Sequence, residues 1–142
     1  MKTTDPLRSY KETQIKTATP GKLVVMLYDG ALKHLALALE AMASRHHHFD
    51  RASEQLIRTQ DIITELMVSL DFERGGEIAR SLFGLYMWMN RQVLDGNIRK
   101  DTGPLEAVRK LLLELRAAWA EAAEKHGSES VTRTAGGVNI AG

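Results

Sequence analysis

Apolar residues recur at alternating spacings of four and three in four segments of the chain, and this repetition constrains the fold more than any other feature. The first segment follows Thr19 and Pro20, a pair typical of a helix start, because threonine can accept a free backbone N–H and proline presets φ. We therefore expect a helix from about Pro20. Its main stripe contains Leu23, Leu27, Gly30, His34, Leu37 and Ala41. A second set widens this stripe into a broad apolar face: Val24, Ala31, Leu35, Ala38 and Met42. Such a helix is expected to be buried.

Two residues inside this stripe carry expectations of their own. Gly30 costs about 1 kcal/mol relative to alanine in helix propensity, so we expect a neighbouring helix to approach closely there. His34 is expected to be a core or boundary histidine that forms a hydrogen bond with a neighbour.

Three further segments repeat the pattern. Residues 50–70 carry one stripe: Ala52, Leu56, Thr59, Ile63, Leu66 and Leu70. Residues 77–99 carry the next: Ile78, Leu82, Leu85, Tyr86, Met89 and Val93. The last runs to about His126: Leu105, Val108, Leu112, Leu115, Trp119 and Ala122. Between them, residues 71–76 with two glycines predict a turn, and residues 101–104 predict a capped helix start with proline near its first position.

Four amphipathic segments of roughly 20 to 25 residues with short connections predict an all-α fold, an antiparallel up-down-up-down four-helix bundle. We expect the bundle over residues 19–126, after an N-terminal arm of residues 1–18. Residues 127–142 are too poor in apolar side chains to offset their ordering entropy, which predicts a flexible tail. The arm is either a frayed terminus or a segment that docks Tyr10 into a groove of the domain.

Composition excludes several classes of function. Lys and Arg number 19 against 18 Asp and Glu and are interspersed with them, so nucleic-acid binding is not expected. The chain has no cysteine, which excludes a disulfide framework and a thiolate metal site. It contains no apolar run of about 18 residues and no signal-peptide pattern, so we expect a soluble protein without membrane insertion.

Three consecutive histidines, His46, His47 and His48, raise the question of a metal site. Neighbouring residues on a helix point about 100° apart and cannot share an ion as an i, i+4 pair does, so we expect a solvated loop. A four-helix metalloenzyme would place Glu-x-x-His on two helices, and the sequence contains no such pair. We expect no enzyme activity and no cofactor.

The third segment has more apolar residues than one stripe can bury, because Phe83, Met87 and Trp88 lie outside it. Either this helix is central or part of it faces a partner, in the manner of a helix bound in a groove. Leu111 and Leu113 similarly flank the stripe of the fourth segment. Arg109 or Arg116 of that segment is expected to pair with nearby acids as an exposed pair within the helix.

Three separated stretches, in order along the chain, resemble the FliS family of flagellar secretion chaperones. The first is Tyr10, Thr13 and Gln14, followed by residues 17–20, Leu23 and residues 26–30. The second is residues 70–80 with Leu85, Tyr86 and Met89, and the third is residues 112–119. The chain departs from the family's usual pattern at residues 46–48 and at 87–88, which bears on the choice of partner.

The resemblance implies a cytoplasmic chaperone, with no reaction and no ATP cycle, that binds the disordered C-terminal region of flagellin. It implies that the chaperone blocks premature polymerisation and delivers flagellin to the flagellar type III export gate. In such proteins the client wraps around the bundle, and the N-terminal arm with its tyrosine, here Tyr10, can occupy part of the same groove. The candidate client-binding residues are Tyr10, Ile15, Phe83, Leu85, Met87, Trp88, Leu111 and Leu113. The bundle pattern alone also permits a helical adaptor or dimerisation module without a flagellar role, and it leaves a homodimer open.

Overall fold

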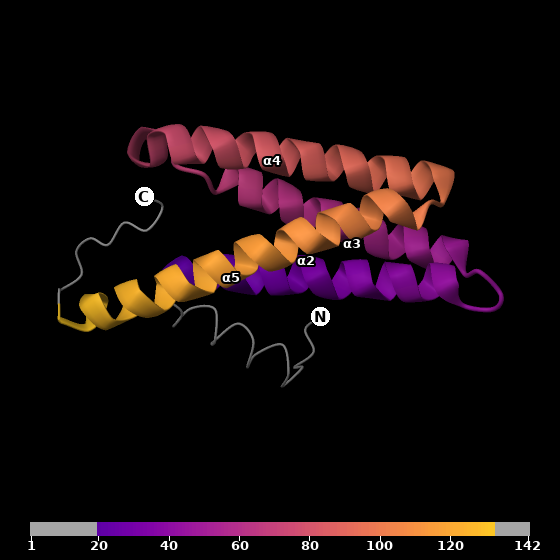
Figure 1. Ribbon diagram of the computed structural model, residues 1–142, viewed down its shortest axis with the longest axis horizontal. Coiled ribbons are helices and arrows are strands. Elements are labelled where there is room, and N and C mark those ends of the chain that lie inside the picture. Colours follow the sequence, from indigo (N-terminus) through magenta and orange to yellow (C-terminus); the bar gives the residue numbers. More distant parts are fainter. Residues whose placement is uncertain (1–19, 133–142) are drawn as a thin grey trace, which may run out of the picture.

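The computed structural model describes the backbone of residues 20–132 and the side chains of residues 20–125. Within that part the chain forms four helices and no strand: α2 (Pro20–Ala43), α3 (Phe49–Val68), α4 (Phe72–Arg99) and α5 (Thr102–Thr132). Short connections join them so that successive helices run in opposite directions (Figure 1). The helices α2 and α4 both pack against α3 and α5, and therefore lie diagonally opposite each other. The predicted all-α four-helix bundle is confirmed.

The core contains one buried stripe from each helix. On α2 the buried residues are Tyr28, Ala31, Leu35, Ala38 and Met42, with Ala41 beside them. The expected main stripe of this helix was therefore displaced: Leu23, Leu27 and His34 are only half-buried, and Leu37 is 39% exposed. Both sets of residues are apolar and adjacent on the helix, so periodicity alone does not say which set faces the core.

Two glycines allow helices to approach closely. A Cβ on Gly30 would lie 3.1 Å from Cδ1 of Ile62 on α3, which confirms the expected close approach. A Cβ on Gly21 would lie 3.0 Å from Cβ of Ala123, so the start of α2 and the late part of α5 pack backbone to backbone.

The connection between α3 and α4 is shorter than expected. The Asp71 carboxylate accepts a hydrogen bond from the backbone N–H of Arg74 at 3.0 Å, and this cap starts α4 at Phe72. The expected turn over residues 71–76 is thus wrong in part, because residues 72–75 are helical. Gly76 then interrupts the helix with φ of 49°, a backbone conformation that favours glycine.

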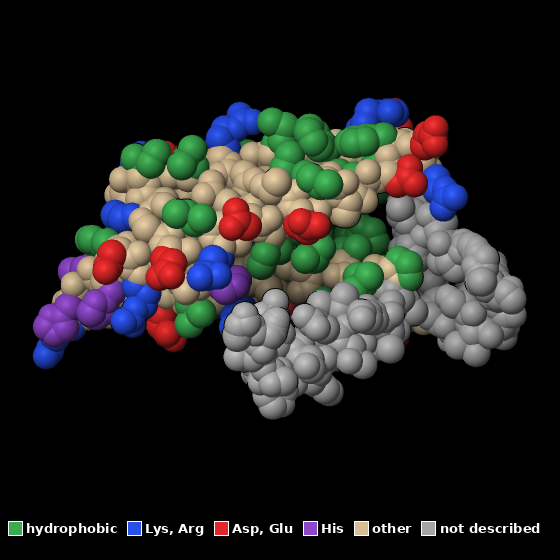
Figure 2. All heavy atoms as spheres, turned by 180° about the vertical axis from the view of Figure 1, so that it is seen from behind, with side chains coloured by type: hydrophobic (Ala, Val, Ile, Leu, Met, Phe, Trp, Pro, Cys, Tyr) green, Lys and Arg blue, Asp and Glu red, His purple; other side chains and the backbone are tan. Residues whose placement is uncertain are grey.

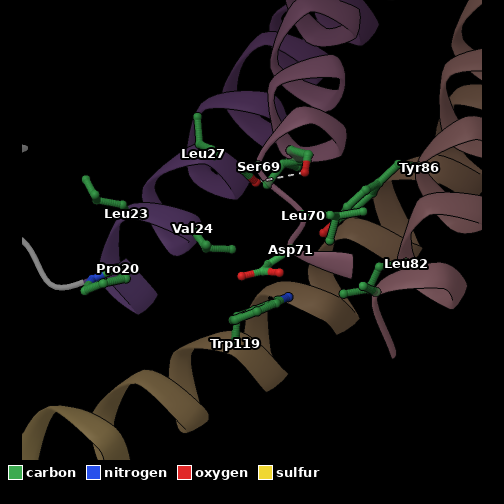
Figure 3. A pocket seen from close by; sticks show the side chains of 12 residues that line it. Pro20, Leu23, Val24, Leu27, Ser69, Leu70, Asp71, Leu82, Tyr86 and Trp119 are labelled. Atoms are coloured by element: carbon green, nitrogen blue, oxygen red, sulfur yellow. Dashed lines mark hydrogen bonds between the residues drawn. The ribbon is translucent and has the colours of Figure 1, made fainter. Parts of the chain in front are cut away.

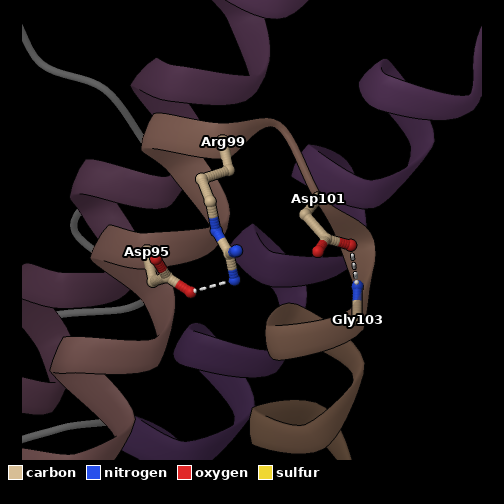
Figure 4. A network of polar contacts seen from close by, with 4 residues as sticks. All are labelled: Asp95, Arg99, Asp101 and Gly103. Carbon is tan, nitrogen blue, oxygen red and sulfur yellow. Dashed lines mark hydrogen bonds and ion pairs between the residues drawn. The ribbon is translucent and has the colours of Figure 1, made fainter.

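The connection between α4 and α5 matches the expected capped start. The Asp101 carboxylate accepts a hydrogen bond from the N–H of Gly103 at 2.9 Å, beside the Asp95–Arg99 ion pair at the end of α4 (Figure 4). The helix that follows extends to Thr132, beyond the expected end near His126.

The bundle has two unlike ends. The histidine-loop end contains the loop 44–48 and the connection 100–101. There Lys100, in the left-handed conformation with φ of 52°, donates hydrogen bonds to Ser53 and Asn97 and lies over the Phe49 ring at 5.9 Å. The cavity end contains the start of α2, the connection 69–71 and the late part of α5. No helix among residues 20–132 is both long enough and apolar enough to cross a membrane.

Candidate functional site

An apolar cavity of about 320 Å³ opens at the cavity end of the bundle (Figure 3). One wall comes from the first turns of α2: Pro20, Leu23, Val24 and Leu27. The opposite side comes from the end of α3 and its connection to α4: Leu66, Ser69, Leu70 and Asp71. The remaining lining residues are Ala79, Leu82 and Tyr86 of α4 and Trp119 of α5.

The course of α5 creates this cavity. At the histidine-loop end α4 and α5 pack tightly, because Gly96 of α4 admits the Leu105 side chain, whose Cγ would lie 2.7 Å from an added Cβ. Towards the other end the two helices diverge, and the yellow part of α5 continues beside the start of α2 (Figure 1). The contact between Gly21 and Ala123 holds α5 against α2 there. Among the described residues, no other helix fills the space between α4 and α5 at this end.

A pair of tyrosines lies at the inner side of the cavity. Tyr28 of α2 and Tyr86 of α4 are fully buried, and their hydroxyl oxygens are 2.5 Å apart. Burial is the largest influence and raises the pKa of both groups above the usual range of tyrosine. Tyr86 raises the pKa of Tyr28 further, whereas a hydrogen bond with Trp119 acts in the opposite direction. Both hydroxyls are therefore protonated at neutral pH and link the diagonal helices.

One charged side chain lies in the cavity wall among the described residues. The Asp71 carboxylate caps α4 and lies 3.9 Å from Nε of Arg74. Figure 3 shows it directed into the same space as Val24 and Trp119. Ser69 also lines the cavity, but its hydroxyl donates to the Leu66 carbonyl at 2.9 Å. The site thus combines apolar walls, one carboxylate and one buried hydroxyl pair.

None of the predicted client contacts that the structure describes lines this cavity. Tyr10 and Ile15 lie outside the described residues. Phe83 is half-buried and packs edge-on against Phe72, with ring centres 5.8 Å apart. Leu85 and Leu111 are half-buried against the core. The others are partly exposed: Met87 at 41%, Trp88 at 38% and Leu113 at 47%.

Helix geometry spreads these candidates over different faces. Met87 and Trp88 point about 100° apart, and Leu111 and Leu113 about 200° apart, so the candidates do not form a single narrow stripe on either helix. Phe83 and Met87 share the side of α4 that faces α3, because Asn90, one helical repeat beyond Phe83, donates a hydrogen bond to Thr64 of α3. Figure 2 shows hydrophobic side chains in an interrupted row over α4. Of the α4 candidates, Met87 and Trp88 are therefore surface residues, whereas Phe83 and Leu85 are half-buried.

Sequence reasoning missed the cavity because it assigned the first turns of α2 to the core. The signal that points to the cavity is the width of the apolar face between Leu23 and Tyr28. A face that wide has more side chains than one buried seam accepts, as was recognised for α4 but not for α2.

The histidines have no part in this site. His46, His47 and His48 lie exposed at the opposite end of the bundle, where Figure 2 shows them projecting. Among residues with described side chains, no group of three or more His, Cys, Asp and Glu is placed to hold a metal ion. The Nδ1–H of His34 donates a hydrogen bond to Oε1 of Gln55 at 2.7 Å, which confirms the expected hydrogen-bonded boundary histidine. A second cleft of about 240 Å³ lies nearby, with a mixed lining of Leu37, Glu40, Ala41, Ser44, His48, Arg51 and Gln55.

The described residues thus form an all-α four-helix bundle with an apolar cavity at one end. The model of the family "Flagellar protein FliS" matches residues 3–126. The chain is 36% identical over 132 residues to the flagellar secretion chaperone FliS of Bacillus subtilis, covering 89% of this chain and 96% of the relative. It is 35% identical to FliSB of Pseudomonas aeruginosa (76% and 84% covered) and to FliS of Salmonella typhimurium (80% and 84% covered). The chain belongs to the FliS family of flagellar secretion chaperones, which is a family of chaperones and not of enzymes.

Proposed function

We propose that this flagellar export chaperone binds the C-terminal segment of newly made flagellin in the cytosol, blocks its premature polymerisation and delivers it to the type III export gate. The observation that supports client binding is the open apolar cavity between α2, α4 and α5. Family membership supports the export role.

The cavity suits a segment that has apolar side chains but no stable fold of its own. Such a segment gains its structure on binding, and the ordering cost lowers its affinity, which favours later release. A flagellin segment that will later be buried between subunits must expose an apolar stripe beforehand. Covering that stripe in the cavity removes the surface that would start assembly.

The exposed apolar residues of α4 extend this proposal beyond the cavity. A client long enough to wrap around the bundle would cross Phe83, Met87 and Trp88, which are partly exposed. Leu113 of α5 is a contact of the same kind. Leu85 and Leu111 pack against the core, so they act through the shape of the bundle.

The N-terminal arm is proposed to compete with the client. The arm, residues 1–18, precedes Pro20 directly in the sequence apart from Thr19, and Pro20 lines the cavity, so a short segment before it has the cavity within reach. The side chains of Tyr10 and Ile15 are the apolar groups that would enter it. Deletion of residues 1–16 should therefore strengthen client binding. Weaker binding would instead make the arm part of the bound surface, and unchanged binding would contradict any role.

Calorimetric titration with a peptide of the C-terminal segment of flagellin from the same organism tests the function. We expect Leu23→Asp, in the cavity wall, to weaken binding by at least about tenfold, because the carboxylate must be buried on binding. Leu37→Asp is the matched control, since it lies on the same helix and is 39% exposed at the other end. Equal effects would place the client elsewhere. No binding by the unaltered protein would favour a helical adaptor or dimerisation module.

A further inference from the structure

One of the two hydroxyl protons of the buried tyrosine pair is not used in the hydrogen bond between them. Each hydroxyl carries one O–H, and the contact between the two oxygens at 2.5 Å consumes only one of the two protons. Among the described residues, neither hydroxyl has another acceptor within hydrogen-bond distance. A buried O–H without an acceptor is rare in native proteins, so this proton calls for a partner.

The cavity decides which hydroxyl keeps the spare proton, because of the two tyrosines only Tyr86 lines it. In the order that uses this opening, Tyr28 donates its own proton to the Tyr86 oxygen. The opposite order would leave the Tyr28 proton in the core, away from the cavity wall. The favoured order leaves the O–H of Tyr86, which does line the cavity, as the free donor.

We propose that the Tyr86 hydroxyl is a specificity-determining contact, which donates a hydrogen bond to a neutral oxygen of the polypeptide segment bound in the cavity. This inference rests on the proposed function, since it takes the flagellin segment as the occupant. The surrounding wall is apolar apart from Asp71, so this hydroxyl is the group that can form a hydrogen bond with a polar atom of the segment.

The chemistry of the acceptor follows from its surroundings. Backbone carbonyls inside a helix already accept helical hydrogen bonds, so the acceptor is a side-chain amide or hydroxyl oxygen, or a carbonyl where a helix ends. A carboxylate of the client is disfavoured because Asp71 places a negative charge in the same wall. The segment is thus predicted to present Asn, Gln, Ser, Thr or a helix end among apolar side chains.

Two matched variants test the inference by calorimetry with the same flagellin peptide. Tyr86→Phe and Tyr28→Phe each delete one buried hydroxyl and break the same hydrogen bond, but only Tyr86→Phe removes the donor in the wall. We expect Tyr86→Phe to weaken binding by about threefold to tenfold, the range of a single neutral hydrogen bond, and Tyr28→Phe to change it by less than about twofold. Equal effects of the two variants would overturn the inference while leaving the proposed function intact.

A measurement on the unaltered protein covers the case in which a variant does not fold. The NMR signal of the hydroxyl-bearing ring carbon reports the hydrogen bonding of each tyrosine. With tyrosine labelled at that carbon, we expect the Tyr86 signal to shift on addition of the peptide and the Tyr28 signal to shift less. A bound peptide that leaves the Tyr86 signal unmoved would overturn the inference. A peptide that does not bind at all would instead overturn the proposed function.

Discussion

The two ends of this bundle are built from the same kind of apolar stripe and reach opposite results. At the histidine-loop end the core is sealed, with Leu56 and Leu105 fully buried and Met42 nearly so. At the cavity end Leu23 and Trp119, which belong to equally regular stripes, remain half-buried around a cavity of about 320 Å³. The contrast shows that apolar content does not decide whether a seam closes; the convergence of the helices does.

Small residues determine which helices converge at each end. Gly96 lets α5 approach α4 at the histidine-loop end, whereas Gly21 and Ala123 bring α5 onto α2 at the cavity end. A helix that changes neighbours along its length cannot fill both seams. The seam that stays open is available for binding. Four predictions test whether the two ends differ in how tightly their helices pack.

The largest expected difference is in the response to loss of side-chain volume. Leu105→Ala, at a fully buried position, should destabilise the protein by about 2–5 kcal/mol, because it leaves a cavity in a packed core. Leu23→Ala should cost less than about 1 kcal/mol, since this side chain already borders open space. Urea unfolding measures both. Similar losses at the two positions would mean that the cavity end is as tightly packed as the other.

The second difference concerns added volume on α4. Gly96→Ala should destabilise by about 1–3 kcal/mol, because its Cβ would meet Cγ of Leu105 at 2.7 Å and the Asp101 carbonyl at 3.0 Å. Gly84→Ala on the same helix is the control: an added Cβ meets nothing within 4 Å. There the gain in helix propensity should stabilise by about 0.5–1 kcal/mol. A stabilising Gly96→Ala would show that the tight approach of α5 is not required.

The tyrosine pair at the cavity should make stability sensitive to alkaline pH. The folded state raises both pKa values above the unfolded value near 10, so the stabilisation is complete below about pH 10 and is lost as the pH rises beyond it. Each tyrosine should contribute a slope of about 1.4 kcal/mol per pH unit above that point. The unfolding temperature should fall less steeply between pH 9 and 11 in a variant that carries both Tyr28→Phe and Tyr86→Phe. Equal slopes would mean that the hydroxyls reach solvent.

The smallest effect is expected where α5 is held to α2 by charge. Arg116 donates two hydrogen bonds to the Asp29 carboxylate, at 2.7 and 3.3 Å, rather than pairing within its own helix as expected. Because the side chains are 39% and 52% exposed, Asp29→Asn should cost less than about 1 kcal/mol. A double-mutant cycle with Arg116→Gln should give a coupling that shrinks at high salt. A salt-independent coupling would contradict a screened surface pair.

Local chemistry made much of the fold predictable. The start of α2 at Pro20 and the cap at Asp101 follow from short-range preferences of proline and aspartate, and the structure has both. The expected turn at residues 71–76 was partly wrong because the Asp71 cap acts earlier than the glycines. Arg109 pairs with Glu106 on the same helix as expected, whereas Arg116 does not, because Asp29 is brought close only by packing.

The candidate site was much less predictable. Met87 and Trp88 were chosen as client contacts because they exceed the needs of one stripe, and they are indeed partly exposed. Leu23, Leu70 and Trp119 fit their stripes well and so gave no reason to expect that they line a cavity. Regular periodicity shows that a residue faces other helices, but it does not show how near those helices come.

The amino-acid sequence alone was sufficient for the four helices of the described residues, most of their starting points and the family, because these depend on residues close together in the chain or on short motifs. The packed structure alone determined the register of the α2 stripe, the pairing of Asp29 with Arg116 and the position of the cavity. The physical reason is that each depends on the angles between helices. Those angles arise from contacts such as Gly96 with Leu105 and Gly21 with Ala123, which join residues far apart in the chain or on different helices.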